Sequence, residues 1–274
     1  MAGRGGGSAN ARTVVAMYGP EAAEYERIWA VELLPFGRSL VERLELRGAR
    51  RILEVGCGVG LLLPDIGRAA GPGAFVVGAD LTFDMVWRAP ASFGRVAMDC
   101  QRPAFAEGVF DAAIAPFVLF HLTDPLEGLR GLHRVLRPGG GFGSATFAQR
   151  RPPDAVKVLT EVLDAFGAAD DPARSGVPDG EALVNSPEKM AEILGAAGFV
   201  DVDARTEVWE RTWSLEEFMR WRSSIGPTHR RLRSLAGADR ERCLAAVRSR
   251  LGAVPADAFV GRDQVILTTA HRYG

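Results

Sequence analysis

The sequence predicts an α/β protein in which a mostly parallel sheet carries helices on both faces. Short apolar segments alternate with amphipathic segments of helical spacing along most of the 274 residues. The first apolar segment, residues 52–55, runs through a glycine-rich turn into a helix that begins near Leu61. Because parallel strands need crossover connections, this alternation favours a parallel sheet that is covered on both sides.

Glycine, proline and capping residues separate these segments. An amphipathic helix opens at Asp124-Pro125 and stops at the glycines 139–141, where a fifth strand is expected to follow. A later helix is expected at residues 187–197. The strands that these patterns predict cover residues 52–55, 74–79, 94–98, 142–147, 202–208 and 265–270.

Residues 51–60 contain the most informative pattern of the chain. Gly56, Gly58 and Gly60 follow the spacing G-x-G-x-G, which differs from the G-x-G-x-x-G of dinucleotide-binding enzymes, and Glu54 precedes them. A loop without side chains turns tightly and offers its backbone N–H groups to a ligand. The carboxylate suits a ligand with an amino group and would repel a diphosphate. The alternative is that the glycines only permit a turn.

With this spacing the loop resembles the first motif of class I S-adenosylmethionine-dependent methyltransferases. The resemblance covers residues 14–150 well and the remainder in outline. It implies a Rossmann-like, doubly wound sheet of seven strands in the order 3-2-1-4-5-7-6, with an added helical cap. It also implies that the loop holds the methionine part of the cofactor, through Glu54, Gly56, Cys57, Gly58 and Gly60.

Acidic residues end the next two strands. Asp80 follows the glycine loop at an interval of about 20 residues, where an acid commonly binds ribose hydroxyls, although such an acid is more often a solvated helix cap. Asp99 stands where the family contacts the adenine amino group, and Cys100 where a side chain lines the ring. The remaining cofactor contacts that the resemblance implies are Leu81, Met85, Pro116 and Phe117.

The apolar run that begins at Val109 resembles the family's fourth strand and ends in Leu119-Phe120-His121-Leu122. Small-molecule members often have Leu-His-His-Leu there, so Phe120 replaces the first histidine. His121 is the candidate general base, and a structural histidine bonded to the backbone is the alternative. The other histidines do not form a metal-ligand set, so no metal is expected. The chain lacks the Asn/Asp-Pro-Pro-aromatic turn of amino-group methylation, which favours small-molecule acceptors.

The N-terminal helix, expected to start at Tyr18-Gly19-Pro20-Glu21 and to end at Pro35, is expected to cover the cofactor. Tyr18 and Tyr25 stand where similar methyltransferases place two aromatic residues over the sulfonium, which an aromatic face attracts and shields from water. The alternative is that Tyr25, Ile28 and Trp29 form the apolar stripe with which this helix packs on the body.

Segments outside the common core are expected to bind the acceptor. Cap elements are predicted at residues 14–46, 149–185 and 209–256, with a polar loop at 167–180 as a mobile lid. Ser214 and Glu217 predict a capping box at the start of a helix. The aromatic residues of these segments are either pocket walls or ordinary core. The candidate acceptor contacts are Trp29, Phe120, His121, Trp213 and Trp221.

Composition agrees with one enzyme domain at residues 14–274 after a disordered tail at 1–13. The 33 basic and 34 acidic residues give no electrostatic footprint for nucleic acid or an anionic membrane. Three scattered cysteines favour a reducing cytoplasm over a disulfide framework. We expect a monomer or homodimer.

Taken with the resemblance, these observations predict methyl transfer from S-adenosylmethionine to an oxygen or carbon of a small, largely apolar metabolite, in natural-product or quinone-type biosynthesis. The alternative is a methyltransferase-like cyclase or isomerase that keeps the cofactor without transferring methyl. A weaker alternative is a nicotinamide oxidoreductase, which Glu54 and the glycine spacing disfavour.

Overall fold

The computed structural model describes residues 6–170 and 180–274, with side chains from residue 11 onward. The chain forms two compact units. The first contains Met1–Ala148, Pro178–Glu207 and Val265–Gly274, and the second contains Gln149–Val177 and Val208–Gln264. Most of the lid expected at 167–180 lies outside the described residues.

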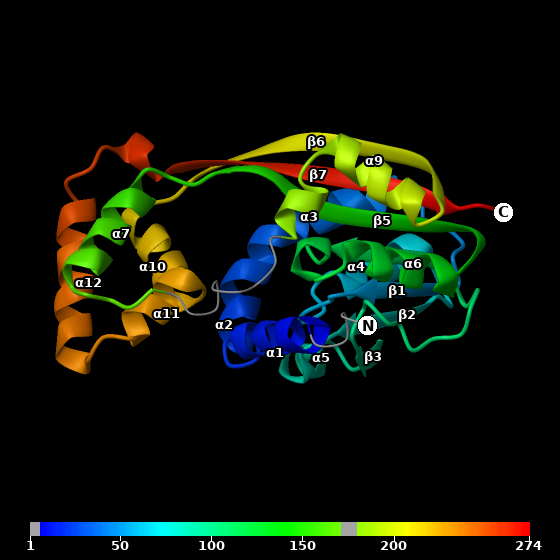
Figure 1. Ribbon diagram of the computed structural model, residues 1–274, viewed down its shortest axis with the longest axis horizontal. Helices are drawn as coiled ribbons and strands as arrows, with labels where there is room; N and C mark the ends of the chain where they lie inside the picture. Colours follow the sequence, from blue (N-terminus) through cyan, green and yellow to red (C-terminus); the bar gives the residue numbers. More distant parts are fainter. Residues whose placement is uncertain (1–5, 171–179) are drawn as a thin grey trace. The chain divides into compact units, whose positions relative to one another are not determined.

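A seven-stranded sheet in the order β3-β2-β1-β4-β5-β7-β6 organises the first unit, which confirms the predicted order (Figure 1). The central strands pair in parallel, with Leu53 of β1 opposite Val77 of β2 and Ala113 of β4. β5, β6 and β7 also contribute residues to the second unit. The strands are β1 (Arg51–Val55), β2 (Phe75–Asp80), β3 (Gly94–Ala97), β4 (Phe110–Pro116), β5 (Leu136–Arg151), β6 (Phe199–Thr212) and β7 (Val260–Arg272).

The fifth strand begins earlier than the sequence predicts. β5 starts at Leu136, directly after helix α6, whereas the glycine run was expected to be a turn. Phe110 pairs with Leu136 and Ala112 pairs with Gly141, so several residues of β5 bulge opposite one residue of β4. Glycine allows this bulge, because a positive φ costs it little. The turn is therefore contained within the strand.

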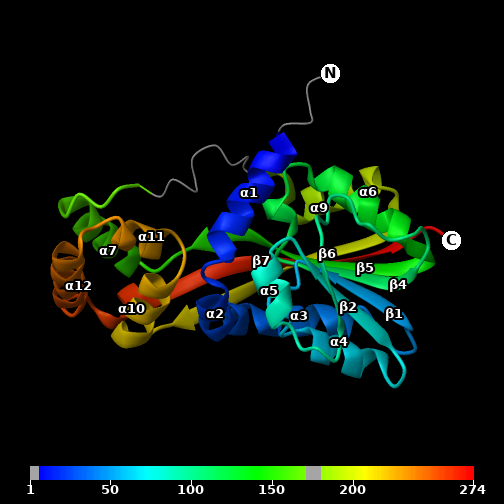
Figure 2. The ribbon, with the colours of Figure 1, turned by 90° about the horizontal axis from the view of Figure 1, so that it is seen from below.

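Helices cover both faces of the sheet. α3 and α4 lie on one face, and α6 and α9 lie on the other (Figure 2). The helices of the first unit are α1 (Gly6–Tyr18), α2 (Ala22–Glu24), α3 (Ala30–Arg43), α4 (Leu63–Ala70), α5 (Phe83–Arg88), α6 (Pro125–Val135), α8 (Glu181–Val184) and α9 (Pro187–Ala196), with a π-helical turn η1 (Tyr25–Trp29) and a 3-10 turn η2 (Leu119–His121).

The N-terminal segment is more helical than the sequence indicates. Residues 6–13 of the expected tail belong to α1, and residues 1–5 lie outside the described part. Helix α3 continues past Pro35, where it was expected to end. A proline removes one backbone hydrogen bond, but Phe36 and Leu40 beyond it are buried. Burial of this apolar face outweighs that loss.

Helices make up most of the second unit, which has an aromatic core. The rings of Trp213 and Trp221 stack with centroids 4.7 Å apart, and Phe218 packs on Phe259 at 5.4 Å. Ser214 and Glu217 form the predicted capping box. The helices are α7 (Ala155–Ala165), α10 (Leu215–Ser224), α11 (Pro227–Arg233) and α12 (Gly237–Leu251), with a 3-10 turn η4 (Ala256–Phe259).

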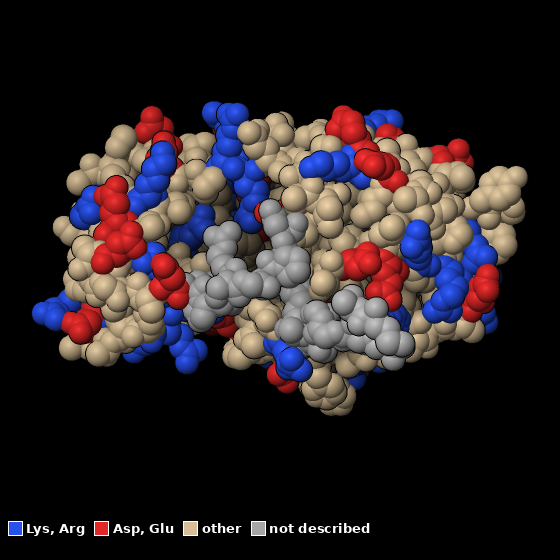
Figure 3. All heavy atoms as spheres, viewed as in Figure 1, with Lys and Arg blue, Asp and Glu red and all other residues tan. Residues whose placement is uncertain are grey.

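The described surface carries charges of both signs. Acidic and basic side chains are interspersed over much of the face that Figure 3 shows. Among the described helices, none combines the length and the apolar composition that crossing a membrane requires.

Candidate functional site

The glycine loop joins β1 to α4 at the carboxyl edge of the sheet. Gly56 has a φ of 62°, and a Cβ built there would lie 2.1 Å from Cγ2 of Val118. Gly58 has a φ of 54°, but a Cβ there would meet Tyr25 and Met85 at 3.4 and 3.6 Å, which are ordinary contacts. The first glycine is therefore required by packing against the loop after β4. The second leaves the loop backbone next to the N-terminal segment.

Asp80 connects the glycine loop to the start of α5. One carboxylate oxygen accepts a hydrogen bond from the backbone N–H of Gly58 at 2.9 Å, and the other accepts one from Thr82 at 2.8 Å. Burial raises the pKa of Asp80, while these two bonds, the side chain of Thr82 and the backbone of Leu81 lower it. Asp80 thus orders the glycine loop and the start of α5.

Glu54 places a buried carboxyl group at the end of β1. It is 2% exposed, and its Oε2 accepts no hydrogen bond from any described residue. Burial first, and the neighbouring charge of Asp80 second, raise the pKa of Glu54 to about 8. Neither Glu54 nor Asp80 forms an ion pair within the described part of the chain. A cationic ligand group would supply the counter-charge that these two carboxyl groups lack. The ammonium group of S-adenosylmethionine is such a group.

The two tyrosines of the N-terminal segment meet at the loop. The rings of Tyr18 and Tyr25 contact each other edge to face with centroids 5.7 Å apart. Burial raises the pKa of the Tyr25 phenol, and Tyr18, Asp80 and Glu54 raise it further. Tyr25 therefore lies close to both carboxyl groups. Met85 belongs to the same small apolar cluster, together with Ala22, Val59, Tyr18 and Tyr25.

Tyr18 also reaches the predicted base. Its phenol oxygen lies 3.2 Å from Nε2 of His121, and the two rings pack edge to face with centroids 5.6 Å apart. In the tautomer with the proton on Nδ1, the phenol donates and Nε2 accepts. Burial lowers the pKa of His121 to about 4, so the imidazole is neutral at neutral pH. The pair joins α1 to the turn after β4.

Aromatic rings surround this turn. Phe117 has a φ of 58°, a left-handed conformation that is uncommon for a bulky residue, and its ring packs on Phe36 and Phe147 at 5.9 and 4.9 Å. The ring of Phe120 contacts His121 at 4.4 Å and Phe147 at 5.8 Å. Strained backbone of this kind is concentrated at functional sites. No sequence pattern pointed to the contributions of Phe36 and Phe147.

The expected adenine side is near the end of β3. Asp99 accepts a hydrogen bond from the backbone N–H of Gln101 at 2.9 Å, and burial raises the pKa of the Cys100 thiol to about 12. Leu81 follows β2 and Pro116 ends β4, so both stand at the carboxyl edge of the sheet. Ligands of open α/β sheets bind at this edge.

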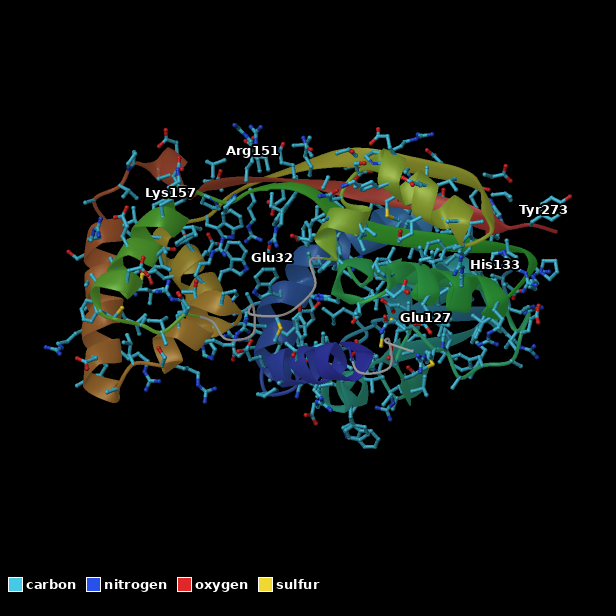
Figure 4. The ribbon with its side chains drawn as sticks, viewed as in Figure 1. Glu32, Glu127, His133, Arg151, Lys157 and Tyr273 are labelled. Carbon is cyan, nitrogen blue, oxygen red and sulfur yellow. The ribbon has the colours of Figure 1, made fainter. Side chains whose placement is uncertain are left out.

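The remaining candidates lie elsewhere. Trp29 ends the π-helical turn that begins with Tyr25, and such turns are frequent at functional sites. Trp213 and Trp221 belong to the second unit, where they are buried. His133 of α6, labelled in Figure 4, packs edge to face on Phe199 at 5.1 Å, as part of the packing between helix and sheet.

Two signals that the sequence analysis did not use become visible in this geometry. Val118 covers the first glycine of the loop, and Thr82, which is 1% exposed, donates its backbone N–H to Asp80. A valine after an aromatic residue and a threonine after an acid are common in many loops. Only the folded chain shows their role.

Comparison with known proteins agrees with this geometry. Residues 53–143 match a family described as methyltransferase domain. The demethylmenaquinone methyltransferase of Mycolicibacterium vanbaalenii is 32% identical over 173 residues, which are 60% of this chain and 75% of the relative. The nocamycin O-methyltransferase of Saccharothrix syringae is 32% identical over 213 residues, which are 70% of this chain and 74% of the relative.

The solved structures show the same fold. The crystal structure of the cyclase SpnF superposes with a TM-score of 0.51 at 20% identity, and the match covers 88% of this chain and 81% of that chain. This likeness shows the architecture alone.

Sheet order, glycine loop and relatives together define the class of protein. The chain belongs to the class I S-adenosylmethionine-dependent methyltransferases of small-molecule type. It is an enzyme that uses S-adenosylmethionine as its methyl donor.

Proposed function

We propose that this enzyme methylates an oxygen or a carbon of a small, largely apolar metabolite that carries an ionisable hydroxyl group, in natural-product or quinone-type biosynthesis. The observation that carries the proposal is the contact between Tyr18 and His121 beside the glycine loop. It supplies a phenol and a neutral imidazole, surrounded by aromatic rings. An enol or a phenol of the acceptor fits these groups.

The residues proposed from the sequence to bind the cofactor would contact different parts of it. Glu54 has the unpartnered oxygen that an ammonium group would engage, and Asp80, which is bonded to the glycine loop, would contact ribose hydroxyls. Tyr18 and Tyr25 would cover the sulfonium, where a ring face attracts positive charge and excludes water. Asp99 and Cys100 would contact the adenine. The other proposed contacts are Gly56, Cys57, Gly58, Gly60, Leu81, Met85, Pro116 and Phe117.

S-adenosylmethionine supplies an electrophilic methyl group when it is bound. His121 is neutral at neutral pH and can accept the acceptor's hydroxyl proton at Nε2, directly or through the Tyr18 phenol. Loss of that proton makes an enol or phenol nucleophilic at its oxygen and at the carbon next to the oxygen-bearing carbon. The proton ends on His121 and the methyl group on the acceptor, and the cofactor would leave as S-adenosylhomocysteine. Phe120 would pack on the acceptor beside His121.

Three tryptophans complete the proposed acceptor contacts. The observations that bear on them differ between Trp29 and the other two. Trp29 shares the π-helical turn with Tyr25. Trp213 and Trp221 form a stacked pair in the second unit, so their rings already have packing partners. We propose that the enzyme acts as a monomer or homodimer on a free metabolite in the cytoplasm, and the near balance of charges supports a partner other than nucleic acid.

A metabolite screen tests the proposal. Purified enzyme and S-adenosylmethionine are incubated with a small-molecule extract, and mass spectrometry follows the gain of one methylene by an acceptor together with formation of S-adenosylhomocysteine. The His121→Gln variant is run in parallel and should lose most of the conversion. An acceptor that is converted without S-adenosylhomocysteine would instead support a cyclase or isomerase.

A further inference from the structure

Arg222 of α10 lies on an aromatic platform in the second unit. Its guanidinium carbon is 4.0 Å from the ring centroid of Trp221 and 5.8 Å from that of Phe218. Trp221 in turn stacks on Trp213, with the ring planes 6° from parallel. The platform fixes the guanidinium through cation–π contacts and removes part of its surface from water.

The charge of Arg222 has no anionic partner within the described residues. It forms no ion pair there, and its buried Nε–H finds no acceptor. Other arginines of the same unit do find carboxylates: Arg231 pairs with Asp164 at 2.5 Å, and Arg250 pairs with Glu161 at 2.6 Å. A charge held away from water is costly unless it is paired.

Charged neighbours of both signs act on Arg222. Burial first, and the positive charge of Arg150 second, lower the pKa of Arg222 to about 10, while Asp263 opposes them. The carboxylate of Asp263 accepts a hydrogen bond at 3.2 Å from the backbone N–H of Arg151, which ends β5 and is labelled in Figure 4. Within the described residues Asp263 forms no ion pair with Arg222, so it does not satisfy the buried Nε–H.

We propose that the second unit binds a small carboxylate, and that Arg222 holds it. A planar guanidinium offers two parallel N–H donors that match the two oxygens of a carboxylate. Such a ligand satisfies the buried Nε–H. The site uses residues of the second unit only. Trp213 and Trp221, which are also proposed acceptor contacts, serve here to hold the guanidinium, and binding at Arg222 needs no methyl transfer.

Benzoate is the probe, because it combines a carboxylate with a flat apolar ring. Its binding to the full chain, without S-adenosylmethionine, is measured by ligand-observed NMR titration. Arg222→Met keeps the apolar stem and removes the charge, and it should weaken benzoate about tenfold or more. Arg222→Lys keeps the positive charge but lacks the two parallel N–H donors. Its affinity for benzoate should lie between those of the wild type and Arg222→Met. Arg220→Met, at an exposed arginine of the same helix, is the matched control.

The expected result is saturable binding of benzoate, weaker binding of the neutral benzamide, and a loss specific to Arg222. The affinity for S-adenosylmethionine, measured on each variant, shows that the chain is folded. If benzoate does not saturate the wild-type protein, or if Arg222→Met and Arg222→Lys bind it as tightly as Arg220→Met does, the site does not exist. That outcome leaves the methyl-transfer proposal untouched, because the probe assay involves no turnover.

Discussion

The phenol oxygen of Tyr18 lies 3.2 Å from Nε2 of His121, although 103 residues separate the two in the sequence. The contact joins the N-terminal helix to the turn after β4, on which the predicted base stands. We infer that Tyr18, besides its proposed place over the cofactor, sets the direction in which the imidazole can exchange a proton.

We predict that this pair works as a unit. His121→Gln should lower kcat about 100-fold, a usual size for loss of a general base, and Tyr18→Phe should lower it less. The kcat of the double variant should be no lower than that of His121→Gln alone, because both substitutions interrupt the same path of proton transfer. Steady-state kinetics of the four proteins checks this, with His133→Gln as the matched histidine control. Fully additive losses would show that the two residues act independently.

Glu54 should couple cofactor binding to pH. Its pKa is about 8 without the cofactor, and an ammonium group favours the ionised carboxylate, so binding should lower that pKa and release a proton. Affinity for S-adenosylmethionine should then rise as the pH increases towards about 8 and level off above it. Calorimetry in buffers of different ionisation enthalpy measures the released proton. Glu54→Gln should abolish the release, and Glu42→Gln, at an exposed acid of α3, should retain it.

The same carboxyl group should affect stability. An acid whose folded-state pKa is raised to about 8 binds a proton that the unfolded chain has already lost above about pH 4.3. Folding stability therefore falls as the pH rises between these two values. The melting temperature of Glu54→Gln minus that of the wild type should therefore be larger at pH 8 than at pH 4.5. Equal differences at both pH values would mean that Glu54 is ionised in the folded protein.

Two glycine variants should separate packing from ligand binding. Gly56→Ala would place its Cβ 2.1 Å from Val118 and should destabilise the fold strongly. Gly58→Ala meets only ordinary contacts and should lose about 1 kcal/mol from its positive φ, yet weaken S-adenosylmethionine at the loop. Denaturant unfolding and cofactor titration of both proteins give the comparison. Equal losses of stability would contradict the separate roles.

Local patterns predicted the alternation of strands and helices and the glycine loop, because apolar periodicity, glycine spacing and terminal acids are properties of short segments. The sheet order followed from the family resemblance that this loop carries. The continuation of α3 past Pro35 was missed, since tertiary burial of Phe36 and Leu40 decides it. The Tyr18 contact with His121 was also missed, as was Arg222, because its missing counter-charge is a property of neighbours brought together by folding. Pattern reasoning therefore found single residues and near neighbours such as Ser214 and Glu217, and could not find partners that are distant in the sequence.

The central claim is that this chain moves a methyl group from S-adenosylmethionine to a hydroxyl-bearing small molecule. The most direct measurement supplies S-adenosylmethionine with a deuterium-labelled methyl group and follows the acceptor from the metabolite screen by mass spectrometry. We predict that the acceptor gains the labelled methyl group in a one-to-one ratio with S-adenosylhomocysteine. Conversion of the acceptor without the label and without S-adenosylhomocysteine would contradict the account.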